Sequence, residues 1–249
     1  MTQLRVLHEG AGVLVVDKPA GALVIPGRGE GGPSLRELLE QQLRRKVFVV
    51  HRLDRDTSGV LVFALDAERH RALSQAFEAG TVRKRYLALV EGRVEAPRLV
   101  DAALAQGRKG RMRVARPGEE GKPSRTRIRP VETFAHASLV EAEPLTGRTH
   151  QIRVHLLEMG HRLLVDHQYG REEPLTEKDL GGAGDTVVLT RTPLHAARLE
   201  WPALPGVEPR AVEAPLASDM ARALELLRAS GPGGTRSSSP TGPDSPPSR

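Results

Sequence analysis

The side chains best suited to chemistry lie in a short polar segment at residues 51–58. They are His51, Arg52, Asp54, Arg55, Asp56, Thr57 and Ser58. A carboxylate flanked by arginines stays ionised, because a nearby cation favours its charged form. An ionised carboxylate can act as a base, a nucleophile or a metal ligand. The spacing does not choose between Asp54 and Asp56, and it also fits a structural turn in which Asp and Ser bond their own backbone.

Two apolar runs, Val47–Val50 and Val60–Leu65, enclose this segment and predict buried strands. A polar loop between two core strands can aim a reactive side chain from a rigid base. Further strands are predicted at Val13–Val16, Arg83–Val90, Asp101–Leu104, Ser124–Pro130, Ser138–Glu143 and Leu194–Trp201. Helices are predicted from Ser34, from Asp66 to Phe77, at His150–Met159 and around Met220–Arg228. The pattern favours an α+β fold with a mixed, largely antiparallel sheet flanked by helices.

Length and composition limit the class of protein. At 249 residues the chain suits one large domain with appendages. It contains no cysteine, which excludes disulfides and thiolate metal sites. Because no apolar run approaches the length of a membrane span, we expect a soluble, cytoplasmic protein. We also expect a monomer. Residues 231–249 are rich in Gly, Ser and Pro and predict a disordered tail, which leaves residues 1–230 for the folded domain.

The positive charge is concentrated in one part of the chain. The net charge is +6, and residues 107–129 are crowded with basic side chains. They include Arg108, Lys109, Arg111, Arg113, Arg125, Arg127 and Arg129. Because residues 124–130 alternate, the last three of these would share one side of a strand and face solvent or phosphate. The cluster predicts a polyanionic partner, although a solvated, flexible charged surface has the same composition.

Other motifs predict no cofactor. The Gly-rich turn at Gly27–Pro33 lacks the Lys-Ser/Thr ending of a phosphate-binding loop, so no nucleotide cofactor is expected. His150, His155 and His161 lack the spacing and the acidic residue of a zinc-binding helix, so no metal is expected. Aromatic residues make up only 3% of the chain, which argues against a broad platform for stacking single strands.

One segment resembles the signature of the RluA family of RNA pseudouridine synthases: His51-Arg52-Leu53-Asp54-Arg55-Asp56-Thr57-Ser58-Gly59. Five further segments resemble motifs of that family and follow in family order: Val15–Gly21, Lys84–Val90, Lys122–Thr126, Leu145–Leu156 and Leu194–Ala196. Together they extend over residues 11–202. The resemblance implies a pseudouridine synthase fold for a catalytic domain within residues 1–230. Because the predicted strand Val13–Val16 begins almost at the N-terminus, we do not expect the small RNA-binding domain that many members carry ahead of the catalytic domain.

The resemblance also implies roles for single residues. Asp54, rather than Asp56, matches the catalytic aspartate, Arg153 the arginine that pairs with it, and Tyr86 the tyrosine that packs beside the target base. The implied reaction isomerises uridine to pseudouridine in structured ribosomal or transfer RNA. We expect a bidentate pair between Arg153 and Asp54 in a closed cavity, because burial alone would oppose the charge of the aspartate.

Target recognition is then expected to fall to the catalytic domain, including residues 107–129. Arg52 matches an arginine that helps displace the target base from its stack, and Arg148 joins the basic residues above as an expected RNA contact. One alternative is a non-catalytic RNA-binding protein on the same scaffold, acting in ribosome assembly. Another is a hydrolase that uses His51 and Asp54, which has no supporting nucleophile motif. The three matched catalytic residues favour the enzyme.

Overall fold

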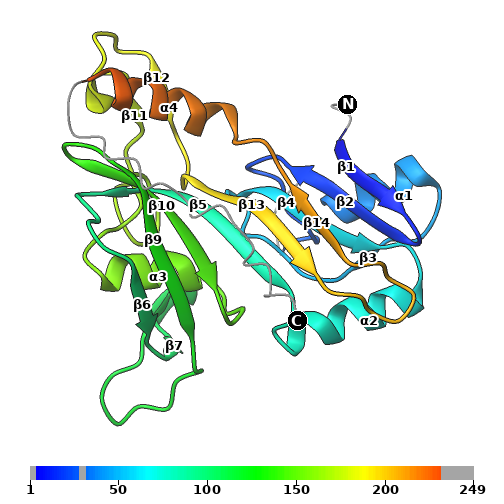
Figure 1. The fold of residues 1–249 in the computed structure, drawn as a ribbon. Helices are drawn as coiled ribbons and strands as arrows, with labels where there is room; N and C mark the ends of the chain where they lie inside the picture. Colours follow the sequence, from blue (N-terminus) through cyan, green and yellow to red (C-terminus); the bar gives the residue numbers. More distant parts are fainter. Residues whose placement is uncertain (1–3, 28–31, 231–249) are drawn as a thin grey trace, which may run out of the picture.

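The computed structural model describes residues 4–27 and 32–230, which build one large sheet with helices on both faces (Figure 1). The strands of this sheet are β1 (Arg5–Gly10), β2 (Val13–Lys18), β3 (Phe48–Val49), β4 (Ser58–Ala64), β5 (Arg83–Glu91), β6 (Arg98–Asp101), β9 (Arg125–Thr133), β10 (Ala137–Pro144), β13 (Leu194–Trp201) and β14 (Arg210–Glu213). Two smaller sheets pair β7 (Leu104–Gln106) with β8 (Met112–Val114), and β11 (Leu175–Thr176) with β12 (Val187–Leu189). The helices are α1 (Leu35–Leu43), α2 (Ala67–Glu78), α3 (Gln151–Glu158) and α4 (Ser218–Ala229), with short 3-10 turns η1 (Arg108–Gly110) and η2 (Lys178–Leu180).

Two sequence predictions concern residues that the structure does not describe. The predicted disordered tail at residues 231–249 lies outside the described residues, as does part of the Gly-rich turn at Gly27–Pro33. Within the described residues, no helix has the length and apolar character needed to cross a membrane.

The main sheet is mixed and largely antiparallel, as the sequence predicted. Its strands follow the order β1-β2-β4-β13-β5-β10-β9-β6, with β3 also paired to β4 and β14 to β13. Only the pairing of β4 with β13 is parallel among these described strands. That pairing places Gly59 beside Ala196. Gly59 has a φ of 110°, and a Cβ there would collide with the backbone of Ala196, so the close parallel contact requires glycine.

The helices cover the sheet according to the alternation of its side chains. On β5, Tyr86, Ala88 and Val90 pack with residues of α3 on one face, whereas Leu87 and Leu89 pack with residues of α4 on the other. In the same way, α1 and α2 pack on opposite faces of β2 and β4. Tyr86 also contacts the cluster under α1, so α1 and α3 lie on the same face of the sheet.

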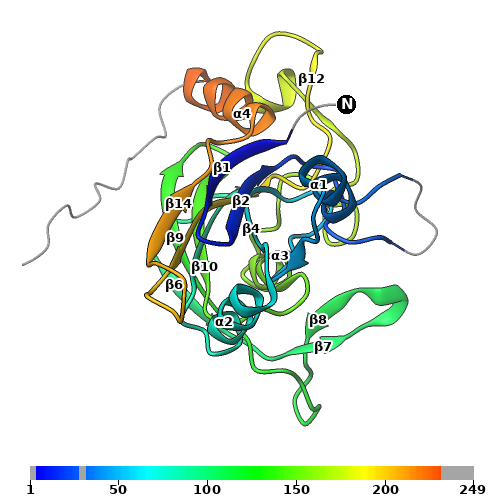
Figure 2. The same cartoon turned by 90° about the vertical axis from the view of Figure 1, so that its right-hand side faces the viewer.

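The predicted strand at Asp101–Leu104 is wrong. β6 ends at Asp101, and β7 begins at Leu104 in a different sheet. Between them the Ala102 amide donates to Ser124, and Ala103 accepts from the Ala115 amide, so the chain exchanges one pairing partner for another. The chain thereby leaves the main sheet and continues into the β7–β8 hairpin, which extends away from the body of the molecule (Figure 2).

Candidate active site

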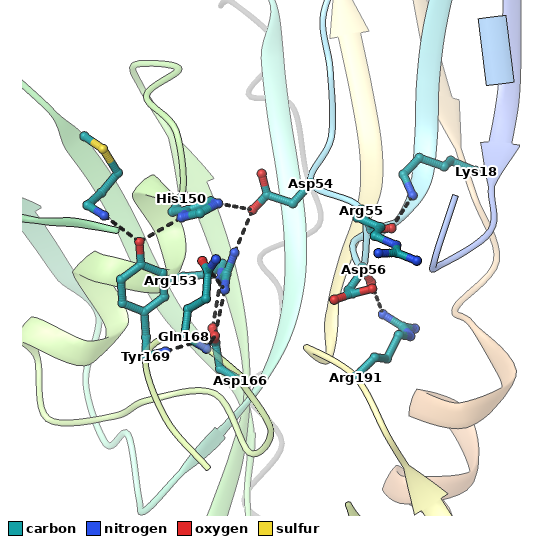
Figure 3. A network of polar contacts seen from close by, with 11 residues as sticks. Lys18, Asp54, Arg55, Asp56, His150, Arg153, Asp166, Gln168, Tyr169 and Arg191 are labelled. Carbon is teal, nitrogen blue, oxygen red and sulfur yellow. Dashed lines mark hydrogen bonds and ion pairs between the residues drawn. The ribbon is translucent and has the colours of Figure 1, made fainter. Parts of the chain in front are cut away.

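A buried lysine holds the polar loop between β3 and β4 in place (Figure 3). Lys18 is 0% exposed, and its Nζ donates to the carbonyl oxygens of Arg55 at 2.7 Å and Pro19 at 2.9 Å. The Gly21 amide donates to the same Arg55 carbonyl at 2.9 Å. Burial lowers the pKa of Lys18 to about 7. The loop is therefore fixed through its backbone, while the side chains of Arg52 and Arg55 remain exposed.

A second anchor holds the loop one residue further on. Arg191 donates through Nη1 to the carbonyl oxygen of Asp56 at 2.8 Å and through Nη2 to Ser58 Oγ at 3.2 Å. It also forms a bidentate pair with Asp219 of α4, at 2.7 and 2.8 Å. Asp56 is thus secured by its backbone, on the side of the loop away from α3 (Figure 3).

Asp54 is the carboxylate of this loop that faces α3. Its Oδ2 lies 3.3 Å from Nη1 of Arg153 and 3.9 Å from Nε2 of His150. Its side chain is 28% exposed, so one flank stays open. The structure therefore separates the two aspartates that the sequence left equivalent, because Asp54 meets the guanidinium and Asp56 does not.

The expected bidentate pair between Arg153 and Asp54 is not formed. Arg153 is 8% exposed and gives its Nε and Nη2 to Asp166 at 2.8 and 2.7 Å, which leaves a single contact for Asp54. Burial opposes the charge of Asp166, but hydrogen bonds from Arg153 and from the Gln168 and Tyr169 amides outweigh it and lower the pKa of Asp166. The Arg153 guanidinium thus contacts two carboxylates, that of Asp166, which is buried, and that of Asp54, which is partly exposed.

Two hollows meet at Asp54, so the prediction of one closed cavity is wrong. The Tyr86 hollow, of about 640 Å³, contains Tyr86, Lys84 and residues 144–153 in its lining. The Gln168 hollow, of about 530 Å³, is lined by Gln168, His167 and residues 23–27 among others. Burial, together with the nearby Asp54, raises the pKa of the Tyr86 hydroxyl above its usual value, so it stays neutral. The carboxylate and a neutral phenol therefore border the same space.

His51 is a structural residue, not a base for hydrolysis. It is stacked on Phe77 with ring centroids 4.4 Å apart, and its Nε2 accepts from the Val62 amide at 3.3 Å. Burial lowers its pKa to about 3. Because its accepting nitrogen is occupied by the backbone, the imidazole has no lone pair directed at Asp54.

Two of the expected RNA-contacting residues line the Tyr86 hollow. Arg52 borders both hollows, and Arg148 borders the Tyr86 hollow, where its Nε donates weakly to the Pro123 carbonyl at 3.4 Å. The structure thus brings Arg52, Arg148, Asp54, Tyr86 and Arg153 to one space.

The arginines of β9 lie on one side of their strand, as predicted, but outside both hollows. Arg125 and Arg127 are exposed, and Arg127 pairs with Glu143 on the neighbouring strand at 3.2 Å. Arg129 pairs in the same way with Glu141 at 3.2 Å. The glutamates of β10 therefore neutralise part of the positive charge of these β9 arginines, which weakens their expected role in binding phosphate.

The β7–β8 hairpin carries the remaining basic residues. Arg108 and Arg111 are exposed, and within the described residues neither takes part in an ion pair. Arg113 is held by Glu119 through two hydrogen bonds of 2.7 Å. The side chain of Lys109 lies outside the described part of the chain. Arg108 and Arg111 are therefore the hairpin arginines available to an anion.

Sequence reasoning missed several residues that shape the site. Asp166 and Tyr169 lie in an irregular segment after α3, where no periodic pattern marks them. His150 was predicted to begin the helix that carries Arg153, but its approach to Asp54 was not predicted. Lys18 and Arg191 act on carbonyl oxygens, and no side-chain motif reveals such contacts.

Comparisons with known proteins show what this chain is similar to. The family model described as RNA pseudouridylate synthase matches residues 12–158. Ribosomal large subunit pseudouridine synthase D of Nitrosomonas europaea is 40% identical over 230 residues, which cover 90% of this chain and 65% of that protein. Ribosomal large subunit pseudouridine synthase C of Yersinia pestis is 40% identical over 236 residues, which cover 90% of this chain and 69% of that protein. The chain thus spans about two thirds of the length of these relatives.

Two solved human structures share the fold. Human RNA Pseudouridylate Synthase Domain Containing 4 superposes with a TM-score of 0.71 at 24% identity, over 90% of this chain and 93% of that chain. Human RNA Pseudouridylate Synthase Domain Containing 1 superposes with a TM-score of 0.69 at 25% identity, over 91% of this chain and 95% of that chain.

Proposed function

We propose that this chain isomerises uridine in RNA to pseudouridine, with Asp54 as the catalytic carboxylate. The chain belongs to the RluA family of RNA pseudouridine synthases, and that membership is the basis of the proposal. The observation that carries this proposal is the position of Asp54. Its carboxylate is held by Arg153 at 3.3 Å at the border of a hollow that also contains Tyr86. This carboxylate is paired with a guanidinium and is still accessible to a substrate, because its side chain is partly exposed.

The reaction fits a site made only of protein side chains. It breaks the bond between uracil N1 and ribose C1′, turns the uracil and joins C5 to C1′, while C5 loses a proton and N1 gains one. Three roles for Asp54 fit this sequence: attack on the sugar, attack on the base, or removal of a sugar proton. Each requires the anion, which Arg153 stabilises. The face of Tyr86 offers a surface for the displaced uracil, whose removal from the stack costs a few kcal/mol.

The substrate we propose is ribosomal RNA of the large subunit, in the cytoplasm. Two of the relatives carry that substrate in their names. Exposed Arg108 and Arg111 on the β7–β8 hairpin, with Arg52 and Arg148 at the hollow, supply cations for phosphate. One chain suffices in this proposal, because Asp54, Tyr86 and Arg153 already border one hollow within a single chain.

Tritium release from large-subunit RNA labelled at uracil C5 tests the proposal directly. Asp54→Asn should abolish release while RNA binding persists, because the amide cannot act as an anionic base or nucleophile. Asp56→Asn is the matched control in the same loop and should retain most turnover, since Asp56 is secured by its backbone carbonyl.

Two outcomes would contradict the proposal. Full turnover by the Asp54→Asn variant would remove the carboxylate from its role. Tight RNA binding by the wild-type protein without any tritium release would favour the non-catalytic alternative, an RNA-binding protein of ribosome assembly.

A further inference from the structure

Two hydrogen bonds lead from the β7–β8 hairpin to His150, whose ring lies next to the candidate catalytic carboxylate (Figure 3). The Met112 amide of β8 donates to the Tyr169 hydroxyl at 2.7 Å. The same hydroxyl lies 2.7 Å from Nδ1 of His150, whose other nitrogen, Nε2, lies 3.9 Å from Oδ2 of Asp54. The four groups come from β8, the segment after α3, the start of α3 and the β3–β4 loop.

The donor groups determine the direction of these hydrogen bonds. A backbone amide can only donate, so the Tyr169 oxygen accepts from Met112. The hydroxyl has one proton of its own, and His150 Nδ1 is the acceptor within reach. Nδ1 of His150 is therefore unprotonated, and in a neutral imidazole the proton then sits on Nε2. The Nε2–H group points at the Asp54 carboxylate.

The opposite tautomer fits the surroundings poorly. It would place the lone pair of Nε2 against the carboxylate of Asp54, and the Tyr169 proton would lose its acceptor within the described residues. The groups that face the imidazole also keep it neutral. Burial lowers the pKa of His150 most, Arg153 and Arg52 lower it further, and Asp54 and Asp166 oppose them without reversing the shift.

The backbone at His150 aims the ring. This residue precedes α3 with φ of 54° and ψ of 19°, a left-handed conformation that few non-glycine residues adopt. Its ring meets Tyr169 edge-on, with centroids 5.5 Å apart. Tyr169 is itself fixed, because its amide donates to Asp166 and its ring lies 4.8 Å from the Arg153 guanidinium. A strained backbone position held by such contacts marks a constraint on function.

We propose that His150 is a positioning residue for Asp54, and that the β7–β8 hairpin sets its Nε2–H tautomer through Tyr169. This inference rests on the proposed function, in which Asp54 is the catalytic carboxylate. The Nε2–H dipole favours the anion and orients it, and a contact of this length commonly tightens when substrate binds. Arg108 and Arg111 lie on the same hairpin, so RNA docked there is linked to His150 by two hydrogen bonds, and from His150 to Asp54 by the 3.9 Å contact.

Nitrogen NMR of protein labelled in its nine histidines measures the tautomer without any activity. The resonances of His150 are identified as those lost in the His150→Gln protein. We expect Nε2–H in the wild-type protein and a mixture of tautomers in Tyr169→Phe, which keeps the ring over Arg153 but loses the hydroxyl. A wild-type Nδ1–H tautomer, or an unchanged tautomer in Tyr169→Phe, would overturn the inference.

Two substitutions at His150 separate positioning from a structural role. The side-chain amide of Gln can place an N–H near the site of Nε2–H, whereas that of Asn lies near Nδ1 but suits the left-handed backbone better. We expect His150→Gln to retain more kcat than His150→Asn, even though the Asn protein melts at the higher temperature. Tyr169→Phe should lower kcat about tenfold at unchanged KM, the effect of one hydrogen bond.

Greater activity of the Asn protein would refute the positioning role. If the wild-type protein released no tritium from RNA, the proposed function would fail, and the tautomer measurement would still decide whether the hairpin controls His150.

Discussion

Asp166→Asn tests the shared guanidinium, because it removes one charge at nearly constant shape. The Asp166 side chain is 1% exposed. Its Oδ1 accepts from Nη2 of Arg153 at 2.7 Å, from the Gln168 amide at 2.9 Å and from the Tyr169 amide at 3.1 Å, and its Oδ2 accepts from Nε of Arg153 at 2.8 Å. An Asn oxygen can serve the three donors at Oδ1. Its NH2 group must then face the Nε–H of Arg153, donor against donor.

The expected loss follows from this geometry. Breaking one side of a buried pair costs about 3–5 kcal/mol, and we expect the lower end because three of the four bonds survive. A loss of about 3 kcal/mol lowers the Tm of a chain of this size by roughly 6–12 °C. Turnover should also fall, because Arg153 loses the partner that fixes its orientation toward Asp54.

The stability difference should depend on pH in one direction. The pKa of Asp166 is lowered from 3.8 in the folded protein, so the carboxylate contributes its stabilisation above pH 3.8. That contribution is lost as the pH falls through the folded-state pKa, and the Asn protein never has it. The gap between the two melting temperatures should therefore be full at neutral pH and shrink in acid.

Thermal unfolding followed by circular dichroism at neutral and acid pH measures both effects. Glu95→Gln is the control, since Glu95 is 75% exposed and lies 3.6 Å from Arg93, and loss of such a pair changes Tm little. An Asp166→Asn protein that melts with the wild-type protein at neutral pH, or a gap that persists in acid, would refute the reasoning.

Two further predictions concern buried and exposed cations. Between about pH 7 and 10.5 the unfolded chain binds a proton at Lys18 that the folded chain does not, so the stability of the wild-type protein should rise with pH in this range. Urea unfolding measures this rise, and the Lys18→Met protein should lack it. An equal rise in the Lys18→Met protein would exclude Lys18 as its source. Replacing Arg108 and Arg111 by Ala should reduce the salt slope of RNA affinity by about two in filter-binding titrations. Arg113→Ala should change the slope less, because Glu119 already occupies that guanidinium, and equal losses would contradict this assignment.

Regular elements could be predicted because their signals are local. Ser34, where the first helix was predicted to begin, forms a capping box with Glu37 at the start of α1, and Asp66 caps α2. The strand predicted at Leu194–Trp201 has those bounds in the structure. The strand predicted at Asp101–Leu104 failed, because composition does not reveal where a chain leaves one partner strand for another.

The site could be predicted only in part. The two aspartates of the loop are alike in sequence, since both neighbour arginines, and only tertiary contacts distinguish them. Arg191 takes the backbone of Asp56 from 135 residues away, and Arg153 meets Asp54 across 99 residues. The choice of Asp54 and of Arg153 as its partner came from the family resemblance, whereas Asp166 and Lys18, which fix Arg153 and the loop, are visible only in the fold.

Sharing Arg153 between two carboxylates resolves a conflict between holding Asp54 and leaving it able to react. A bidentate pair would engage both oxygens of Asp54 and hold them against the guanidinium. Asp166 instead takes two donors of Arg153 and fixes its direction, and one nitrogen remains for Oδ2 of Asp54. Among the described residues no hydrogen bond reaches Oδ1 of Asp54, so this oxygen stays free toward the hollows. The buried carboxylate fixes the guanidinium, and the exposed carboxylate keeps one oxygen available.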